Sequence, residues 1–284
     1  MGLARKFLKY IERFVLARQA CKFVLRQWTA PKDLAALADV MASMRLRGLL
    51  ETVALERPAA RRILVIAPHP DDEMIGPGGT VIKACRDGAE VTVLHLTKPM
   101  GEAGHTRMSE AADVARRFGY HVVSLDIPEG ALKADDATVE SLAAVVDRVR
   151  PEAIMVPFLL DDHVEHRVAS LLLAAAWTKN LLASAVEVWG YQVYSALTPN
   201  VAVDITDVAK DKADAIRMWK YSAMRQRDWA HFALGRDAFN LRFLDGAPGP
   251  RYAEAFIVLP IGEFAALCER YVNAESAGGI VLDT

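Results

Sequence analysis

Apolar residues follow two different spacings along most of this chain. Short continuous runs, such as residues 63–67, are typical of strands that are buried on both faces of a parallel sheet. The stretches between these runs carry apolar residues at the spacing of an amphipathic helix. The pattern predicts, in chain order, strand 63–67, helix 78–87, strand 91–96, helix 106–118, strand 121–125, helix 137–149 and strand 153–157.

This alternation of strands and helices predicts an α/β fold. We expect a Rossmann-like, doubly wound, mainly parallel sheet with helices on both faces. In a strand order of the 3-2-1-4 kind, the first and fourth strands are neighbours, and ligands bind beyond their carboxyl ends. Later in the chain, weaker signals predict strands at 186–194, 201–204 and 255–259 and a helix at 207–224.

The beginning of the chain follows a different pattern. Residues 3–28 carry apolar positions at helical spacing, with seven basic residues between them against a single acid, Glu12. Such a basic amphipathic helix predicts one of two roles for residues 1–30: contact with a membrane surface, or packing in self-association or on the rest of the chain. A second helical pattern runs from residue 34 to about residue 55. We therefore expect a helical extension at 1–60 and an α/β domain at 61–284.

Composition narrows the class of protein. The chain has 284 residues, of which 52% are hydrophobic and 25% charged, enough for one large domain with an appendage. A net charge of −2 gives no indication of nucleic-acid binding. The three cysteines are too scattered for a disulfide framework, which favours a reducing, cytoplasmic location. No apolar run reaches the ~18 residues of a membrane span, so contact with the inner membrane face would be peripheral.

The candidate chemistry begins where the first predicted strand ends. His69 and Asp72 are nitrogen and oxygen donors three residues apart, in a loop that Pro68 and Pro70 stiffen. Such donors suit Zn²⁺, or another divalent first-row ion such as Fe²⁺. Asp71, beside the predicted ligand, could take a proton from a metal-bound water. A third ligand must come from another part of the chain, because catalytic zinc sites keep three protein ligands and one open position.

The loop after the fourth predicted strand carries a matching group of polar residues. It contains Asp161, Asp162, His163, Glu165 and His166, and its two histidines lie three residues apart at the start of the next predicted helix. Because the first and fourth strands are expected to be neighbours, this loop would face the first one across the crevice. The two loops together predict a metal site.

The stretch from Ala67 to Glu73, which reads Ala-Pro-His-Pro-Asp-Asp-Glu, resembles the signature of the PIG-L/LmbE family of metal-dependent N-acetyl deacetylases. Pro68 is inserted before the histidine of that signature. The second motif, which runs from His163 to His166, resembles the family's His-x-Asp-His, with Glu165 in place of the aspartate. The resemblance runs from about residue 63 to residue 260. It implies a zinc-dependent hydrolase that removes acetyl from an N-acetylated amino sugar or glycoconjugate, for example one that contains N-acetylglucosamine.

The resemblance also implies roles for individual residues. His69, Asp72 and His166 would bind the metal, and Asp71 would be the general base that activates the attacking water. His163 would stabilise the oxyanion or protonate the leaving group, for which we expect it to be charged at the working pH.

Other residues are expected around this centre. Arg107 and Glu129 match family positions that contact substrate, although Arg107 could instead form an ordinary helix-surface ion pair with Glu110. Three acidic residues are expected to contact the metal ligands or His163 without binding the metal themselves: Glu73, Asp162 and Glu165. Within this group, Glu165 is expected to orient His163.

Two alternatives stay open at this point. The chain could be a family member that binds glycans but has lost turnover, or a metal hydrolase that acts on a different amide or ester. The features that keep these alternatives open are Glu165, the inserted Pro68 and a shortened loop at 98–104.

Overall fold

The first predicted strand is β2 (Arg62–Ala67), which lies between two parallel neighbours, β3 (Glu90–Lys98) and β5 (Ala153–Pro157). A computed structural model of the protein describes residues 52–182, 186–220, 228–246, 249 and 251–277. β4 (His121–Pro128) pairs with β3 at the edge of the sheet. The order β4-β3-β2-β5 confirms the predicted neighbourhood of the first and fourth strands.

Four further strands complete an eight-stranded sheet in the order β1-β7-β8-β6-β5-β2-β3-β4. They are β1 (Val53–Leu55), β6 (Glu187–Tyr191), β7 (Val201–Asp204) and β8 (Ala253–Pro260). β8 runs antiparallel to both β6 and β7, and every other pair in the sheet is parallel. The prediction of a mainly parallel sheet is therefore confirmed.

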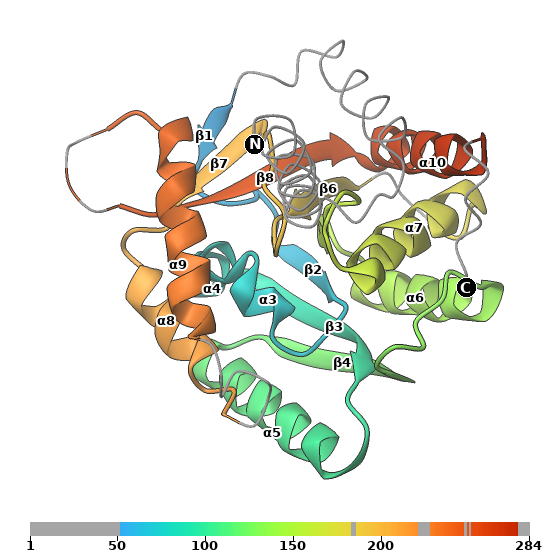
Figure 1. The fold of residues 1–284 in the computed structure, drawn as a ribbon, viewed down its shortest axis with the longest axis horizontal. Helices are drawn as coiled ribbons and strands as arrows, with labels where there is room; N and C mark the ends of the chain where they lie inside the picture. Colours follow the sequence, from blue (N-terminus) through green and yellow to red (C-terminus); the bar gives the residue numbers. More distant parts are fainter. Residues whose placement is uncertain (1–51, 183–185, 221–227, 247–248, 250, 278–284) are drawn as a thin grey trace, which may run out of the picture.

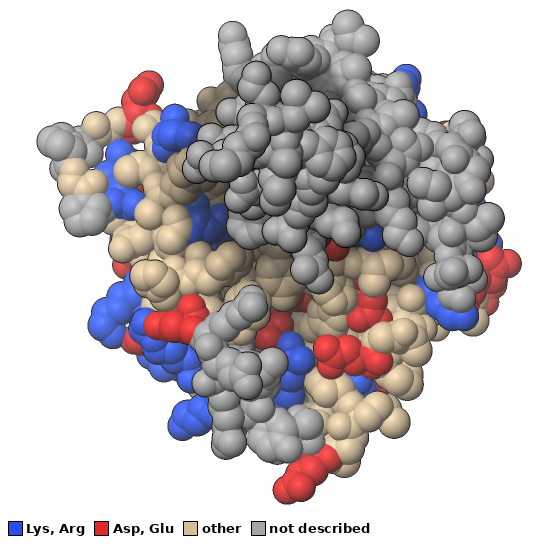
Figure 2. Space-filling model, in the orientation of Figure 1, with Lys and Arg blue, Asp and Glu red and all other residues tan. Residues whose placement is uncertain are grey.

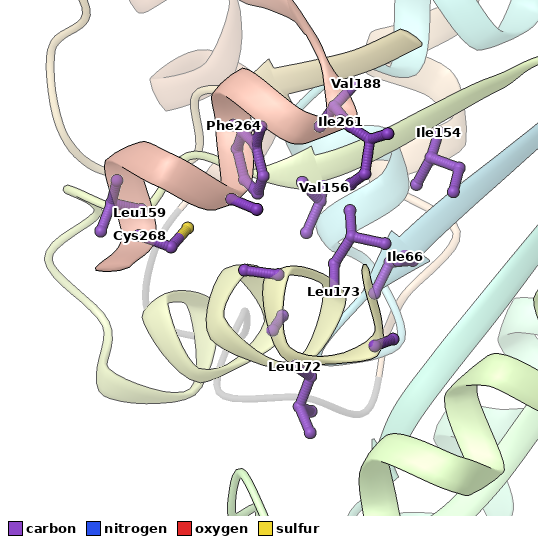
Figure 3. Packing of buried hydrophobic residues seen from close by; sticks show 14 of the residues in the cluster. Ile66, Ile154, Val156, Leu159, Leu172, Leu173, Val188, Ile261, Phe264 and Cys268 are labelled. Atoms are coloured by element: carbon purple, nitrogen blue, oxygen red, sulfur yellow. The ribbon is translucent and has the colours of Figure 1, made fainter. Parts of the chain in front are cut away.

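Helices cover both faces of the sheet (Figure 1). The described helices are α3 (Asp72–Ile75), α4 (Gly78–Arg86), α5 (Gly101–Phe118), α6 (Asp136–Val149), α7 (Val164–Thr178), α8 (Ala209–Ile216), α9 (Trp229–Asn240), the short 3₁₀ helix η2 (Leu241–Phe243) and α10 (Ile261–Ala277). One buried cluster joins α6, α7 and α10 to the sheet, and Figure 3 shows Leu173 of α7, Phe264 of α10 and Ile66 of β2 among its side chains. A second cluster joins α3, α4, α5, α8 and α9 to the opposite face.

Several element ends differ from the prediction. α5 begins at Gly101 rather than at residue 106, with Glu102 in its first turn, where an acid suits the helix dipole. β6 ends at Tyr191 rather than at residue 194, because the backbone N–H of Tyr194 is held by a carboxylate instead of a strand. α8 is shorter than the predicted helix 207–224 and closes in tight turns at Met218 and Trp219; residues 221–227 lie outside the described part.

The prediction of a helix as far as about residue 55 is wrong for its last residues. Val53–Leu55 form β1, which adds to the edge of the sheet beside β7, and the backbone N–H of Val53 donates to Asn200. The sheet therefore begins before residue 61. The basic helix predicted within residues 1–51 lies outside the described residues. In the described part of the chain, no helix is both long and apolar enough to cross a membrane.

Candidate metal centre and active site

The loop between β2 and α3 carries the first group of polar side chains. His69 and Asp71 lie on this loop, and Asp72 is the first residue of α3. Asp71 has a φ of 138°, a backbone region that residues with a side chain rarely occupy and that costs about 1–3 kcal/mol. The carboxylate of Glu73 accepts the backbone N–H of Asp71 at 3.0 Å and helps to hold this conformation. Backbone strain is thus located at the residue predicted to be the base.

His166 joins this group from the first turn of α7. Its Nε2 lies 3.2 Å from Asp72 Oδ2, and His69 Nδ1 lies 3.0 Å from the same oxygen. All three side chains are buried. The two loops meet because β5, which leads to α7, pairs directly with β2. The structure therefore brings together the three residues that were predicted to bind a metal. Figure 2 shows acidic and basic side chains gathered where α3 lies in Figure 1.

The donor set of these residues fits a divalent metal ion. Asp72 Oδ1 and His166 Nε2 are buried and have no hydrogen-bond partner among the described residues. Unpaired buried polar atoms are costly, and coordination to a cation would satisfy both of them. Two imidazole nitrogens and a carboxylate oxygen are ligands that Zn²⁺ and its first-row neighbours accept.

His163 lies next to this centre and could be an alternative ligand. Its ring centroid is 4.8 Å from the ring centroids of both His69 and His166, and the ligating atoms of the three histidines lie within 4.8 Å of one another. His163 also caps α7, since its Nδ1 accepts the backbone N–H of Glu165 at 3.2 Å. This capping bond leaves only Nε2 to face a substrate or an ion.

The expectation that His163 is charged is wrong. Burial lowers the pKa of His163 to about 4, and the charges of His166 and His69 add to this effect. The capping bond agrees, because a charged imidazole carries hydrogen on both nitrogens and could not accept an N–H at Nδ1. Both observations favour a neutral His163 ring with its proton on Nε2.

Asp161 supports His166, although the sequence had predicted a supporting role for the neighbouring Asp162 and none for Asp161. Asp161 Oδ1 lies 2.9 Å from His166 Nδ1 and holds a proton on that nitrogen, so Nε2 is the nitrogen that can bind a metal once its own proton has left. The backbone N–H groups of Tyr194 and Ser195 donate to the other oxygen of Asp161. Asp162 instead offers its backbone carbonyl to Arg167 at 3.1 Å. Neither spacing nor residue type distinguishes the two neighbouring aspartates in the sequence.

Glu165 contacts His69 rather than His163, which it was expected to orient. Its Oε2 lies 2.7 Å from His69 Nε2, and its Oε1 accepts the backbone N–H groups of Gly130 and Leu132. The reason is that the His163 ring folds back onto its own helix, so the Glu165 side chain reaches across to the β2 loop. Glu165 thereby holds the tautomer of a predicted ligand.

Protons occupy the two ligand histidines when no metal is bound. Burial disfavours the charged form of both rings, but nearby carboxylates outweigh it. Asp72 and Glu165 raise the pKa of His69 to about 9, and Asp72 and Asp161 raise the pKa of His166 to about 10. A metal ion must displace these protons, so its binding should weaken as the pH falls.

Arg107 contacts the predicted base directly. Its guanidinium lies 2.6 Å from Asp71 Oδ2 and donates to the carbonyl of Pro70 at 2.9 Å, whereas Glu129 lies 3.7 Å away. Burial raises the pKa of Asp71 to about 6, and the charge of Arg107 opposes this rise. Glu110, the alternative partner of Arg107, accepts the backbone N–H of Lys220. The expected substrate roles of Arg107 and Glu129 stay predictions.

A buried polar group that the sequence analysis did not identify lies beneath the loop. Glu73 accepts the hydroxyl of Tyr120 at 3.2 Å, and its other oxygen lies 3.3 Å from Nε2 of His95, a fully buried residue of β3. His95 carries no motif, and its position next to Glu73 follows only from the pairing of β3 with β2. The predicted supporting role of Glu73 has a physical basis here, because the same carboxylate holds the Asp71 backbone.

A second buried group holds the far end of α3. Lys212 uses all three hydrogens of its ammonium group, on Asp237 at 2.7 Å, Glu254 at 2.6 Å and the carbonyl of Gly76 at 2.9 Å. Glu254 also accepts the first backbone N–H groups of α4. Because a four-residue helix has little stability of its own, these contacts fix the position of α3 and hence of Asp72.

The part of the chain that carries this site is similar to known deacetylases. Residues 64–177 match the family model described as PIG-L: GlcNAc-PI de-N-acetylase. The diacetylchitobiose deacetylase of Thermococcus kodakarensis is 28% identical over 233 residues, which cover 73% of this chain and 86% of that protein.

Two solved structures show that the fold recurs. N,N'-diacetylchitobiose deacetylase from Pyrococcus horikoshii aligns with a TM-score of 0.64 and 23% identity, over 82% of this chain and 96% of that one. The 4-carboxy-2-hydroxymuconate hydratase GalB from Pseudomonas putida KT2440 aligns with a TM-score of 0.58 and 22% identity, over 72% and 96%. Since these two proteins have different activities, the shared fold does not decide the reaction.

Proposed function

We propose that this protein belongs to the PIG-L family, whose model matches residues 64–177, and that it is a metal-dependent hydrolase that removes acetyl from an N-acetylated amino sugar or glycoconjugate. The observation that carries the proposal is the meeting of His69, Asp72 and His166, where Asp72 Oδ1 and His166 Nε2 are buried and lack a hydrogen-bond partner within the described residues. The choice of an amino sugar as substrate rests on the relative from Thermococcus kodakarensis, which is a diacetylchitobiose deacetylase.

These three residues would hold the metal, for which Zn²⁺ is our first choice and Fe²⁺ the alternative. A bound divalent ion would supply Lewis acidity and would make a water molecule more acidic. Side chains of the protein would supply the rest of the chemistry. Asp71 is placed to accept the proton of the attacking water, and its pKa of about 6 suits a base near neutral pH. The Nε2–H of neutral His163 is placed to donate a hydrogen bond to the oxygen that becomes negative.

Replacement of Asp71 by asparagine tests the assignment of the base. We expect acetate release to fall by about 10²–10⁴-fold, because the amide keeps the shape of the side chain but cannot accept the proton. Acetate would be measured with an N-acetylglucosamine-containing substrate, alongside metal content by elemental analysis. Equal activity in the variant would contradict the assignment. Metal bound by wild type without acetate release from any N-acetylated sugar would favour a binding protein or a hydrolase of another amide or ester.

Replacement of Arg107 by glutamine separates its two possible roles. Asp71 must be ionised to accept a proton, so activity is present above its pKa and is lost as the pH falls through about 6, or lower if a bound cation lowers that pKa further. Loss of the Arg107 charge should raise this pKa and move the acid limb of the profile to higher pH. The measurement is kcat against pH.

A matched control lies on the same helix. Arg116 is exposed and pairs with Asp113 on the surface, so Arg116→Gln should leave the profile unchanged. A rise in KM for Arg107→Gln with an unmoved acid limb would instead support the predicted contact with substrate.

A further inference from the structure

Three aromatic side chains continue outward from the candidate metal centre. The Tyr194 ring stacks on His166 at a centroid distance of 5.3 Å and an angle of 12°. Trp229 lies 5.7 Å from Tyr194, and Phe232 lies 5.5 Å from Trp229 and 6.4 Å from Tyr194. We call Tyr194, Trp229 and Phe232 the aromatic strip. Its inner end packs on His166, a fully buried predicted ligand, and its outer end is Phe232, which is 40% exposed.

The backbone that carries the aromatic strip is held in place by residues close to the predicted ligands. Tyr194 follows β6, and its backbone N–H is held by Asp161, the residue that orients His166. Trp229 and Phe232 lie three residues apart in the first turn of α9, so they share one face of that helix.

Arg236, further along α9, joins the parts of this framework. Its guanidinium donates to the carbonyl of Ile75 at the end of α3, and to the carbonyls of Gln192 and Val193 in the segment that leads to Tyr194. The aromatic strip therefore keeps a defined position relative to α3 and Asp72.

We infer that the aromatic strip is a carbohydrate-stacking subsite, which binds the sugar ring next to the acetamido sugar. This inference rests on the proposed function. The strip carries no charge, and its two outer rings are those of the partly buried Trp229 and the exposed Phe232, which suits the C–H face of a pyranose better than a phosphate or another anion. Phe232 is exposed and contacts Tyr194, which stacks on His166, so the strip joins the protein surface to the buried centre. The substrate then has at least two rings: one at the metal centre and one on the strip.

Substrate length tests the subsite. We would compare kcat/KM for N,N'-diacetylchitobiose with kcat/KM for N-acetylglucosamine, in wild type and in Trp229→Ala and Phe232→Ala. The ratio of the two values should fall by about tenfold in each variant, the scale that stacking on an aromatic side chain contributes to binding. Trp229→Phe should restore most of the ratio, because it keeps an aromatic face.

The controls separate a subsite from a packing role. Phe239 lies on the same helix, is 57% exposed and contacts the Arg242 guanidinium at 3.9 Å, so Phe239→Ala should leave the ratio unchanged. Phe232→Ala removes an exposed ring and keeps the test valid if Trp229→Ala unfolds, which thermal unfolding would reveal. An unchanged ratio, or equal losses on both sugars, would overturn the inference.

Failure of the proposed function would give a different result. If wild type releases acetate from neither sugar, calorimetric titration with N,N'-diacetylchitobiose tests the aromatic strip alone. Binding that weakens by about tenfold in Phe232→Ala would support the subsite in a protein without this activity. No binding by wild type, or equal binding by the variant, would overturn it.

Discussion

Replacement of His166 by alanine is expected to remove the bound metal and to abolish measurable acetate release in a chain that still folds. His166 is fully buried, its Nε2 lies 3.2 Å from Asp72 Oδ2, and Asp161 orients its other nitrogen. A site with two remaining ligands cannot hold a catalytic ion firmly, because such sites use three protein ligands. Elemental analysis after dialysis, with an acetate assay and circular dichroism, would measure all three properties.

Two further variants sharpen this prediction. Asp161→Asn should lower metal affinity by about 10- to 100-fold, which is the usual effect of removing a group that orients a ligand. His121 is exposed at the start of β4, so His121→Ala should keep both metal and activity. Full metal content in His166→Ala would contradict the predicted ligand set.

His163 decides between the two possible sets of ligands. If His69, Asp72 and His166 bind the metal, His163→Ala should lose activity but keep the metal, because the variant lacks only the donor to the oxyanion. If the three histidines form the site, His163→Ala should lose the metal as His166→Ala does. The two outcomes differ in elemental analysis alone.

Replacement of Lys212 by methionine is expected to lower the free energy of unfolding by about 3–5 kcal/mol, the cost of removing one partner from a buried ion pair. Lys212, Asp237 and Glu254 are all almost completely buried, and the variant would leave Glu254 without its cation and Asp237 paired with Arg236 alone. The carbonyl of Gly76 would also lose a donor, which should loosen α3. Urea unfolding followed by circular dichroism would measure the change.

Lys210 provides the matched control, since it lies on the same helix and undergoes the same substitution. It is 86% exposed and pairs with Asp214 at i, i+4, a contact worth about 0.3–0.5 kcal/mol. Lys210→Met should therefore change the free energy of unfolding by less than about 1 kcal/mol. Equal effects of the two substitutions would show that the buried group does not stabilise the fold.

Local sequence patterns were enough to predict the mainly parallel sheet and the two loops that form the candidate centre. Runs such as 63–67 identify buried strands, because a strand with both faces covered needs a continuous apolar stretch. The alternation of strands and helices then restricts the order of the sheet, which places the loop of His69 opposite that of His166. These inferences succeed because they depend on local pattern and on general rules of chain connection.

Only the tertiary structure decided which carboxylate supports which histidine. Asp161 contacts His166 and Glu165 contacts His69, although the sequence had favoured Asp162 and Glu165 as neighbours of His163. Side-chain direction sets such contacts, and it depends on how α7 is placed against the β2 loop rather than on distance along the chain.

Neither the strand Val53–Leu55 nor the aromatic strip could be predicted from the sequence, and for the same reason. β1 pairs with β7 across a long sequence separation, and the rings of the strip come from segments on either side of α8. A short apolar segment or a scattered aromatic residue has no local pattern that distinguishes these roles from a helix end or a core position. Their physical basis is packing between elements that are distant in the sequence, and this is settled only when the chain has folded.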